Sequence, residues 1–103
     1  MQVERIIAKK NKKLIYDPLG FFLIFIDRKK NEIILEHYKG IYDGKKIVTG
    51  RLNKIIVGKN AEEICHTLAR ENIVSRIEHA CYLGRELMKA EEALRKGERY
   101  EQD

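Results

Sequence analysis

The fold is decided by the stretch Phe21-Phe-Leu-Ile-Phe-Ile-Asp-Arg-Lys-Lys-Asn-Glu-Ile-Ile-Leu-Glu-His-Tyr38. Its first six residues are all apolar, which predicts a strand covered on both faces. Such a strand lies centrally in its sheet, or one of its faces meets a second copy of the chain. The polar turn that follows ends in Asn31, a residue that readily adopts the left-handed conformation of short hairpin loops. The stretch therefore predicts an antiparallel hairpin.

After the hairpin, the sequence predicts two more short strands. Glycines at positions 40, 44 and 50 indicate a turn-rich connection. Within it, the apolar segments Lys46–Thr49 and Leu52–Val57 have the length and the β-branched residues of strands. We therefore expect a sheet of about four antiparallel strands.

Two helices are predicted in the second half of the chain. Asn60 followed by Glu63 forms a capping box, which starts a helix at Ala61 that ends near Asn72. A second capping box, Ser75 with Glu78, starts a helix that continues to about residue 96, where Gly97 ends it. Together with the hairpin, these helices predict an α+β fold in which two C-terminal helices pack on an antiparallel sheet.

The last helix has an unusually wide apolar side. At 100° per residue, an arc of about 180° is filled by nine residues: Ile77, Ala80, Cys81, Leu83, Gly84, Leu87, Met88, Ala90 and Leu94. This arc is wider than one packing seam, so part of it is expected to face the other helix or a partner copy. Gly84 costs a helix about 1 kcal/mol relative to alanine, which suggests that another backbone approaches it closely. A homodimer through this helix is one prediction.

Length and composition limit the class of protein. At 103 residues the chain is expected to be a single domain, residues 1–103, with residues 1–12 as an edge or flexible start and residues 98–103 as a frayed tail. The abundance of Lys, Glu, Arg and Ile, with no Trp, is typical of thermophilic proteins. The net charge of +5 is spread over several loops, which argues against nucleic-acid binding.

The sequence also predicts the cellular compartment and whether the chain binds a metal ion. The longest apolar run is far shorter than the roughly 20 residues that cross a bilayer. Two cysteines do not form a disulfide framework, so we expect a cytoplasmic protein with reduced thiols. Cys65 and His66, like His79 and Cys81, point in different directions from their helices. We therefore expect no metal site, and we expect both cysteines to be small buried apolar residues.

Four segments carry a resemblance to a known family: Asp17–Arg28, Glu36-His-Tyr38, Asn60–Ile64 and Val74–Leu87. The chain resembles an uncharacterised domain known mainly from methanogenic archaea. That domain also occurs fused to pterin-binding, dihydropteroate-synthase-like proteins, and related segments accompany proteins that resemble one component of the tetrahydromethanopterin methyltransferase. The resemblance implies an accessory role in pterin or one-carbon metabolism, with a pterin-type ligand or a pterin-related partner protein.

The candidate site lies on the polar side of the last helix. Residues three, four and seven positions apart share a helix face, and the candidates for ligand or interface contacts are Arg76, His79, Tyr82, Arg85 and Glu86, with His37 from the hairpin. A histidine with a carboxylate partner can act as an acid or base near neutral pH. The alternative is a solvated helix face, or an interface of a homo-oligomeric domain without a small-molecule ligand. No nucleophile or metal set accompanies these residues, so an accessory binding module is favoured over an enzyme.

Overall fold

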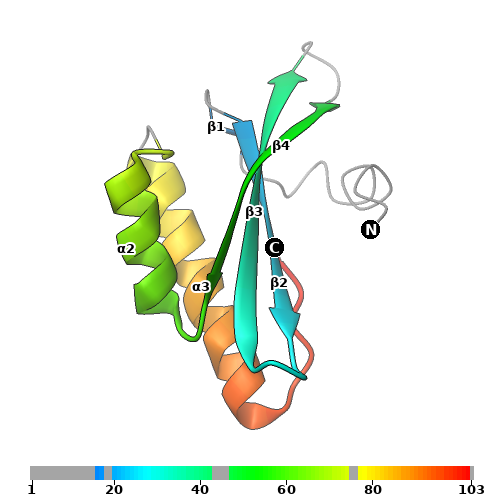
Figure 1. The fold of residues 1–103 in the computed structure, drawn as a ribbon, viewed down its shortest axis with the longest axis vertical. Coiled ribbons are helices and arrows are strands. Elements are labelled where there is room, and N and C mark those ends of the chain that lie inside the picture. Colours follow the sequence, from blue (N-terminus) through cyan, green and yellow to red (C-terminus); the bar gives the residue numbers. More distant parts are fainter. Residues whose placement is uncertain (1–15, 18–19, 43–46, 75–76, 103) are drawn as a thin grey trace.

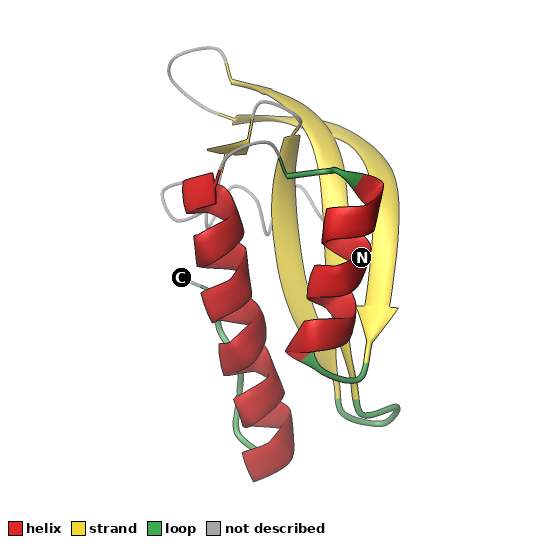
Figure 2. Cartoon of the chain, turned by 90° about the vertical axis from the view of Figure 1, so that its left-hand side faces the viewer, coloured by secondary structure: helices red, strands yellow, loops and turns green. Residues whose placement is uncertain are grey.

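The computed structural model describes residues 16–17, 20–42, 47–74 and 77–102. The elements follow one another as β1 (Tyr16–Asp17), β2 (Gly20–Asp27), β3 (Glu32–Tyr42), β4 (Ile47–Gly58), α2 (Ala61–Glu71) and α3 (Ile77–Lys96). The strands form one antiparallel sheet in the order β1-β2-β3-β4, and β1 is only two residues long. Both helices lie against the same face of this sheet (Figures 1 and 2). The predicted α+β fold is confirmed.

The hairpin forms as predicted. β2 and β3 pair antiparallel from Phe21 with Tyr38 to Asp27 with Glu32. Asn31 has a φ of 54°, which is the left-handed conformation, and its N–H donates to the carbonyl of Arg28 at 3.3 Å. The carboxylate of Asp27 also accepts the backbone N–H groups of the next turn residues, so local polar contacts set the register of the hairpin.

The prediction of two separate short strands after the hairpin is wrong. They are one strand, β4, that runs without interruption from Ile47 through Gly50 to Gly58. β3 is likewise longer than expected and reaches Tyr42 by way of Gly40. The pairing of β3 with β4 shifts register between His37 and Tyr38 and again between Lys39 and Ile41. Gly40 and Gly50 lie at the second shift, where a glycine permits a bulge or bend without ending the strand. Gly44 lies outside the described residues.

The predicted helix ends agree with the structure wherever it describes them. Asn60 caps α2 by accepting the N–H of Glu63 at 2.9 Å, while the Glu63 carboxylate reaches back to the N–H of Lys59. Asn72 ends α2 in the left-handed conformation, with a φ of 53°. Gly97, with a φ of 70°, ends α3 in a Schellman arrangement. The predicted cap Ser75 lies outside the described residues.

The core lies between the sheet and the two helices. It is built from the alternating residues of the strands that face the helices and from one side of each helix: Phe22, Ile24, Ile33, Leu35, Ile56, Ala61, Ile64, Leu68, Leu83, Leu87 and Ala90. α3 therefore covers the sheet with only part of its wide apolar arc. The rest of that arc is exposed, and it is described with the site below.

Candidate functional site

Glu86, on the inner side of α3, is a buried carboxylate held by the protein itself. Its side chain is 0% exposed. The hydroxyl of Tyr100 donates to Oε1 at 2.9 Å, and Nζ of Lys89 lies 3.2 Å from Oε2. The charge is therefore paired and hydrogen-bonded, as a buried carboxylate requires. Through Tyr100, Glu86 binds the segment after α3.

Tyr82, one turn before Glu86, also faces the segment that follows α3. Its hydroxyl lies 3.5 Å from Nε2 of Gln102, and its ring lies 5.8 Å from the guanidinium carbon of Arg85. That distance is within the range of cation–π attraction. Arg85 itself is exposed. The structure thus places two candidates, Tyr82 and Glu86, beneath the tail and leaves Arg85 at the surface.

The tail itself differs from the frayed end that we expected. Gln102 is 5% exposed, and its side-chain amide binds the backbone of β2 in two places. It accepts the N–H of Ile24 at 2.9 Å and donates to the carbonyl of Phe22 at 3.2 Å. These are the groups that a neighbouring strand would otherwise bind. The tail has no regular secondary structure, but it packs along the edge of β2 and buries part of the polar side of α3.

The remaining candidates on α3 are His79 and Arg76. His79 is partly buried, and it lies two helical turns, or about 10 Å along the axis, from Glu86. The carboxylate of Glu86 is engaged by Tyr100 and Lys89, and the pairing of His79 with Glu86 stays a prediction. Arg76 lies outside the described residues.

His37 is a buried residue of the central part of the sheet. It is 2% exposed, and its ring lies 4.8 Å from that of Phe22, on the helix-facing side. Nδ1 of His37 lies 2.9 Å from the amide nitrogen of Asn53, which donates to it. The histidine is therefore held by stacking and by a hydrogen bond across two strands.

A second buried pair has no counterpart among the residues predicted from the sequence. On the sheet face away from the helices, the hydroxyl of Tyr38 donates to Oε1 of Glu36 at 2.9 Å, and both residues are buried. Burial, together with the neighbouring carboxylate, raises the pKa of Tyr38. The sequence signal for this pair is Glu36, a glutamate that lies between Ile34 and Tyr38 on that face of the strand.

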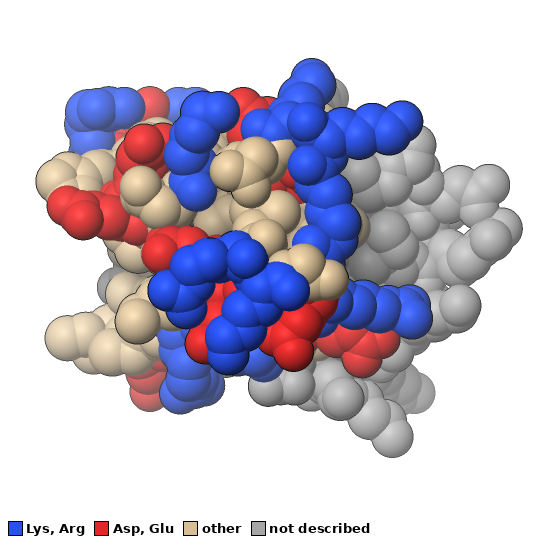
Figure 3. All heavy atoms as spheres, turned by 90° about the horizontal axis from the view of Figure 1, so that it is seen from below, with Lys and Arg blue, Asp and Glu red and all other residues tan. Residues whose placement is uncertain are grey.

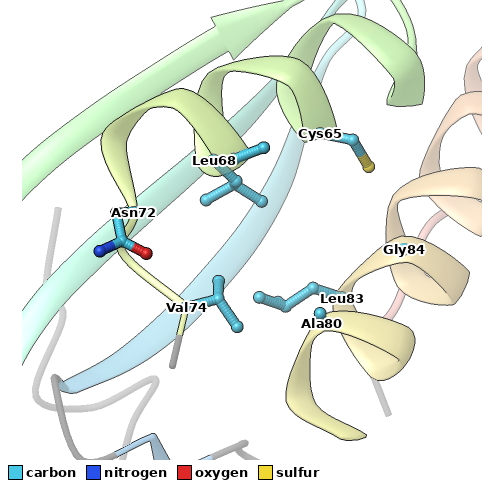
Figure 4. A pocket seen from close by; sticks show the side chains of 8 residues that line it. Cys65, Leu68, Asn72, Val74, Ala80, Leu83 and Gly84 are labelled. Carbon is cyan, nitrogen blue, oxygen red and sulfur yellow. The ribbon is translucent and has the colours of Figure 1, made fainter. Parts of the chain in front are cut away.

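A pocket of about 190 Å³ lies between α2 and α3. Its lining is mostly small or apolar (Figure 4), and consists of Cys65, Leu68, Ala69, Asn72, Val74, Ala80, Leu83 and Gly84. Figure 4 shows side chains of both helices directed toward this space, with the Asn72 amide at one end. Burial raises the pKa of the Cys65 thiol, which makes it a weak nucleophile at neutral pH. The pocket can hold an apolar group.

Beside this pocket, α3 presents apolar side chains to solvent. Ile77 is 83% exposed and Met88 is 67% exposed, although both belong to the predicted apolar arc. Cys81 is also exposed, so our prediction that it is a core residue is wrong. The physical reason is geometric: α3 rests on the sheet through Leu83 and Leu87, and a helix cannot bury an arc of about 180° against a single layer.

Gly84 sits between the pocket and this exposed side. Apart from the neighbouring backbone of α3, a Cβ atom built at Gly84 would meet no atom of the described residues within 4 Å. The close backbone approach that we predicted at this glycine is therefore not made by the part of the chain that the structure describes. The space at Gly84 is open, and it continues the pocket toward the surface.

Charged groups of both signs lie together at one end of the molecule. Figure 3 shows Lys and Arg interspersed with Asp and Glu on the end of the molecule that carries the hairpin turn and the last turn of α3, where Glu92 pairs with Lys96 at 3.0 Å. Within the described residues, no three His, Cys, Asp or Glu side chains are grouped to hold a metal ion. None of the helices in the described part of the chain has the length and apolarity to cross a membrane.

Three relatives are informative. The chain is 43% identical over 96 residues to the uncharacterized protein MJ0107 of Methanocaldococcus jannaschii, covering 93% of this chain and 17% of that protein. It is 32% identical over 105 residues to a Ycf91-like protein of Nostoc sp., covering 84% and 83%. It is 33% identical over 94 residues to the uncharacterized protein ycf91 of Pyropia yezoensis, covering 90% and 78%. Relatives therefore occur outside the archaea, and no solved structure matches the chain significantly.

The family comparison covers most of the domain. Residues 16–103 match the family described as PterinBD-DUF4346, a domain of unknown function, and the match includes all strands and helices described above. The chain spans about a sixth of the M. jannaschii relative but most of the two Ycf91 relatives, so the same domain occurs in proteins of different length. This chain therefore belongs to the PterinBD-DUF4346 family.

Proposed function

We propose that this domain is a non-catalytic interaction module of a pterin-related protein system, and that it binds a polypeptide partner at the pocket between α2 and α3. The observation that carries the proposal is the apolar pocket beside the exposed side chains of Ile77 and Met88. Apolar side chains that are exposed around a preformed pocket are typical of protein–protein contact sites.

The polar candidates support a structural role more than a catalytic one. Glu86 and Tyr82 contact Tyr100, Lys89 and Gln102, so these hydrogen bonds stabilise the packing of the tail on α3. A catalytic carboxylate must reach a substrate, whereas the side chain of Glu86 is 0% exposed. The buried polar groups therefore serve the fold, and the binding surface lies on the other side of α3.

The pocket lining does not suit a pterin as its main occupant. The pyrimidine edge of a pterin carries several hydrogen-bond donors and acceptors, which lose free energy in a pocket that does not match them. Asn72 supplies the one amide side chain of the eight lining residues. We therefore assign pterin binding to a partner protein. The pterin-related setting is supported by the family description.

The cellular setting is part of the same proposal. Cys65 and Cys81 are unpaired, which is consistent with a reducing, cytoplasmic environment. An exposed thiol at Cys81 on a binding surface would be covered when the partner is bound.

Native mass spectrometry of the full chain tests this function, because it reports retained small molecules and protein partners together. We expect a retained polypeptide and no pterin. Ala80→Leu, which fills the pocket, should release the partner, whereas Arg70→Leu, an exposed position of α2 outside the pocket lining, should retain it. A pterin mass that is retained by the natural chain and lost in Ala80→Leu would overturn the proposal, as would the absence of any bound species.

A further inference from the structure

We infer that the partner at this site is a second copy of the chain, bound through an antiparallel pair of α3 helices related by a twofold axis. The inference rests on the proposed function, since it takes the same site and names its occupant. The surface concerned is the α3 stripe, defined as Ile77, Cys81, Gly84 and Met88.

The α3 stripe is continuous and faces away from the core. At 100° per residue its members lie within an arc of about 60° on one side of the helix. The fully buried Glu86 lies on the opposite side of α3, and the two long side chains of the stripe are 83% and 67% exposed. A helix face directed at water is ordinarily polar, so an apolar stripe in this position indicates a protein contact.

The stripe is complementary to itself. Ile77 and Met88 protrude from its two ends, whereas its centre is open at Gly84 and continues into the pocket. In an antiparallel pair centred between Cys81 and Gly84, Ile77 meets the partner's Met88 and Cys81 meets the partner's Gly84. The exposed apolar ends thus cover each other, and the small residues at the centre of the stripe let the two helices approach closely. A twofold interface requires this kind of self-complementary surface.

Charges on one flank of the stripe select the antiparallel direction. Glu78 and Arg85 are seven positions apart and lie on the same flank of α3, away from α2. A twofold axis between antiparallel helices keeps equivalent flanks together, so Glu78 approaches the partner's Arg85, and the same pair forms a second time by symmetry. A parallel pair would instead direct this charged flank at the partner's α2 flank, which is lined by small and apolar residues such as Ala80 and Ala69.

The length of α3 is sufficient for such a pair. Its 20 residues extend about 30 Å, and the stripe occupies the first 12 of them. In the same arrangement, the α2 helices of the two copies lie on the same side of the α3 pair, opposite the charged flank. Cys65 and Ala69 of α2 border the pocket on this side. Small residues at these positions permit close approach of the second copy.

Sedimentation equilibrium of the full chain with charge-reversal variants tests the inference. We expect a dimer whose dissociation constant rises about fivefold to tenfold in Glu78→Arg and in Arg85→Glu, because each change places like charges together twice. The double variant Glu78→Arg with Arg85→Glu should return to within about twofold of the natural chain, since it restores opposite charges. Arg70→Glu, outside the stripe and the pocket lining, should leave the dimer unchanged.

Met88→Glu provides a stronger perturbation at an exposed position, and circular dichroism should show an unchanged fold. It should weaken the dimer at least about 100-fold, because it buries a carboxylate against the partner's Ile77. A natural chain that is monomeric at all concentrations would overturn the second-copy inference. If a different polypeptide were then retained in mass spectrometry and released by Ala80→Leu, the proposed function would still stand. A dimer that is insensitive to Met88→Glu and to both charge reversals would also contradict the inference.

Discussion

The side-chain amide of Gln102 binds the backbone of Ile24, 78 positions earlier in the chain, through an N–H···O bond of 2.9 Å. A second bond from the same amide to the carbonyl of Phe22 makes Gln102 a substitute for one residue of a neighbouring strand. The tail therefore closes the β2 edge, and it does so beside the polar side of α3. This relationship explains why Tyr82 and Glu86 face inward, whereas the α3 stripe faces outward.

Gln102→Ala should destabilise the protein by about 1–3 kcal/mol, because the N–H of Ile24 is left buried without an acceptor. Urea unfolding followed by circular dichroism measures this change. Glu101→Ala is the matched control, since Glu101 is exposed and adjacent in sequence. Equal stability of the two variants would show that the tail is not bound to β2 in solution.

Tyr100→Phe should cost about 1–2 kcal/mol, because a hydrogen bond to the Glu86 carboxylate is lost while the ring remains. Glu86→Gln should cost more, since it also removes the negative charge that pairs with Lys89. A double-mutant cycle should give a coupling energy above about 0.5 kcal/mol between Tyr100 and Glu86. Strict additivity of the two changes would contradict the contact.

Two glycines should respond in opposite directions to the same substitution. In Gly58→Ala the new Cβ would lie 2.8 Å from Cγ1 of Ile64 and 3.2 Å from Cβ of Glu63, so the start of α2 must shift at a cost of about 1–3 kcal/mol. In Gly84→Ala the new Cβ meets none of the other described side chains, and the change should stabilise the monomer by up to about 1 kcal/mol. Unfolding free energies at high dilution compare the two, and a loss of stability in Gly84→Ala would indicate a contact within the chain.

Alkaline pH should destabilise the protein through Tyr38. Its pKa is raised in the folded state by burial and by Glu36, so the folded protein favours the protonated phenol. The resulting stabilisation is present below the ordinary tyrosine pKa of about 10, and it is lost as the pH rises above that value, where the unfolded chain ionises first. Tyr38→Phe should flatten the fall of the unfolding midpoint above about pH 10, where an unfolded tyrosine ionises and the folded Tyr38 stays protonated. An unchanged slope would contradict the burial of this pair.

Local signals in the sequence predict much of the fold. Asn31, Asn60, Asn72 and Gly97 mark turns and helix ends whose hydrogen bonds involve residues only a few positions away. Such signals are readable because the conformation depends on the residue itself and its near neighbours. The break predicted at Gly50 is wrong, since a glycine in a strand also permits a bend, and the choice depends on the pairing strand.

The site is predicted less completely, because its contacts join residues that lie far apart in the sequence. The apolar arc of α3 is evident in the sequence, but the division into a buried half at Leu87 and an exposed half at Met88 depends on where the sheet and α2 meet the helix. The contacts of Gln102 with β2 join opposite ends of the described chain, and no local pattern indicates them. The outward position of Cys81 follows from the same long-range packing.

Cross-linking through Cys81 tests the central claim, the pairing of two α3 stripes, most directly. In the antiparallel pair the two Cys81 residues flank the twofold axis. Packed helix axes are about 8–10 Å apart, so a bismaleimide of about that length can join the two thiols. We predict a covalent dimer in the natural chain and in Cys65→Ser, and its loss in Cys81→Ser and Met88→Glu. A chain that remains monomeric after treatment, or that cross-links equally well without Cys81, would contradict the account.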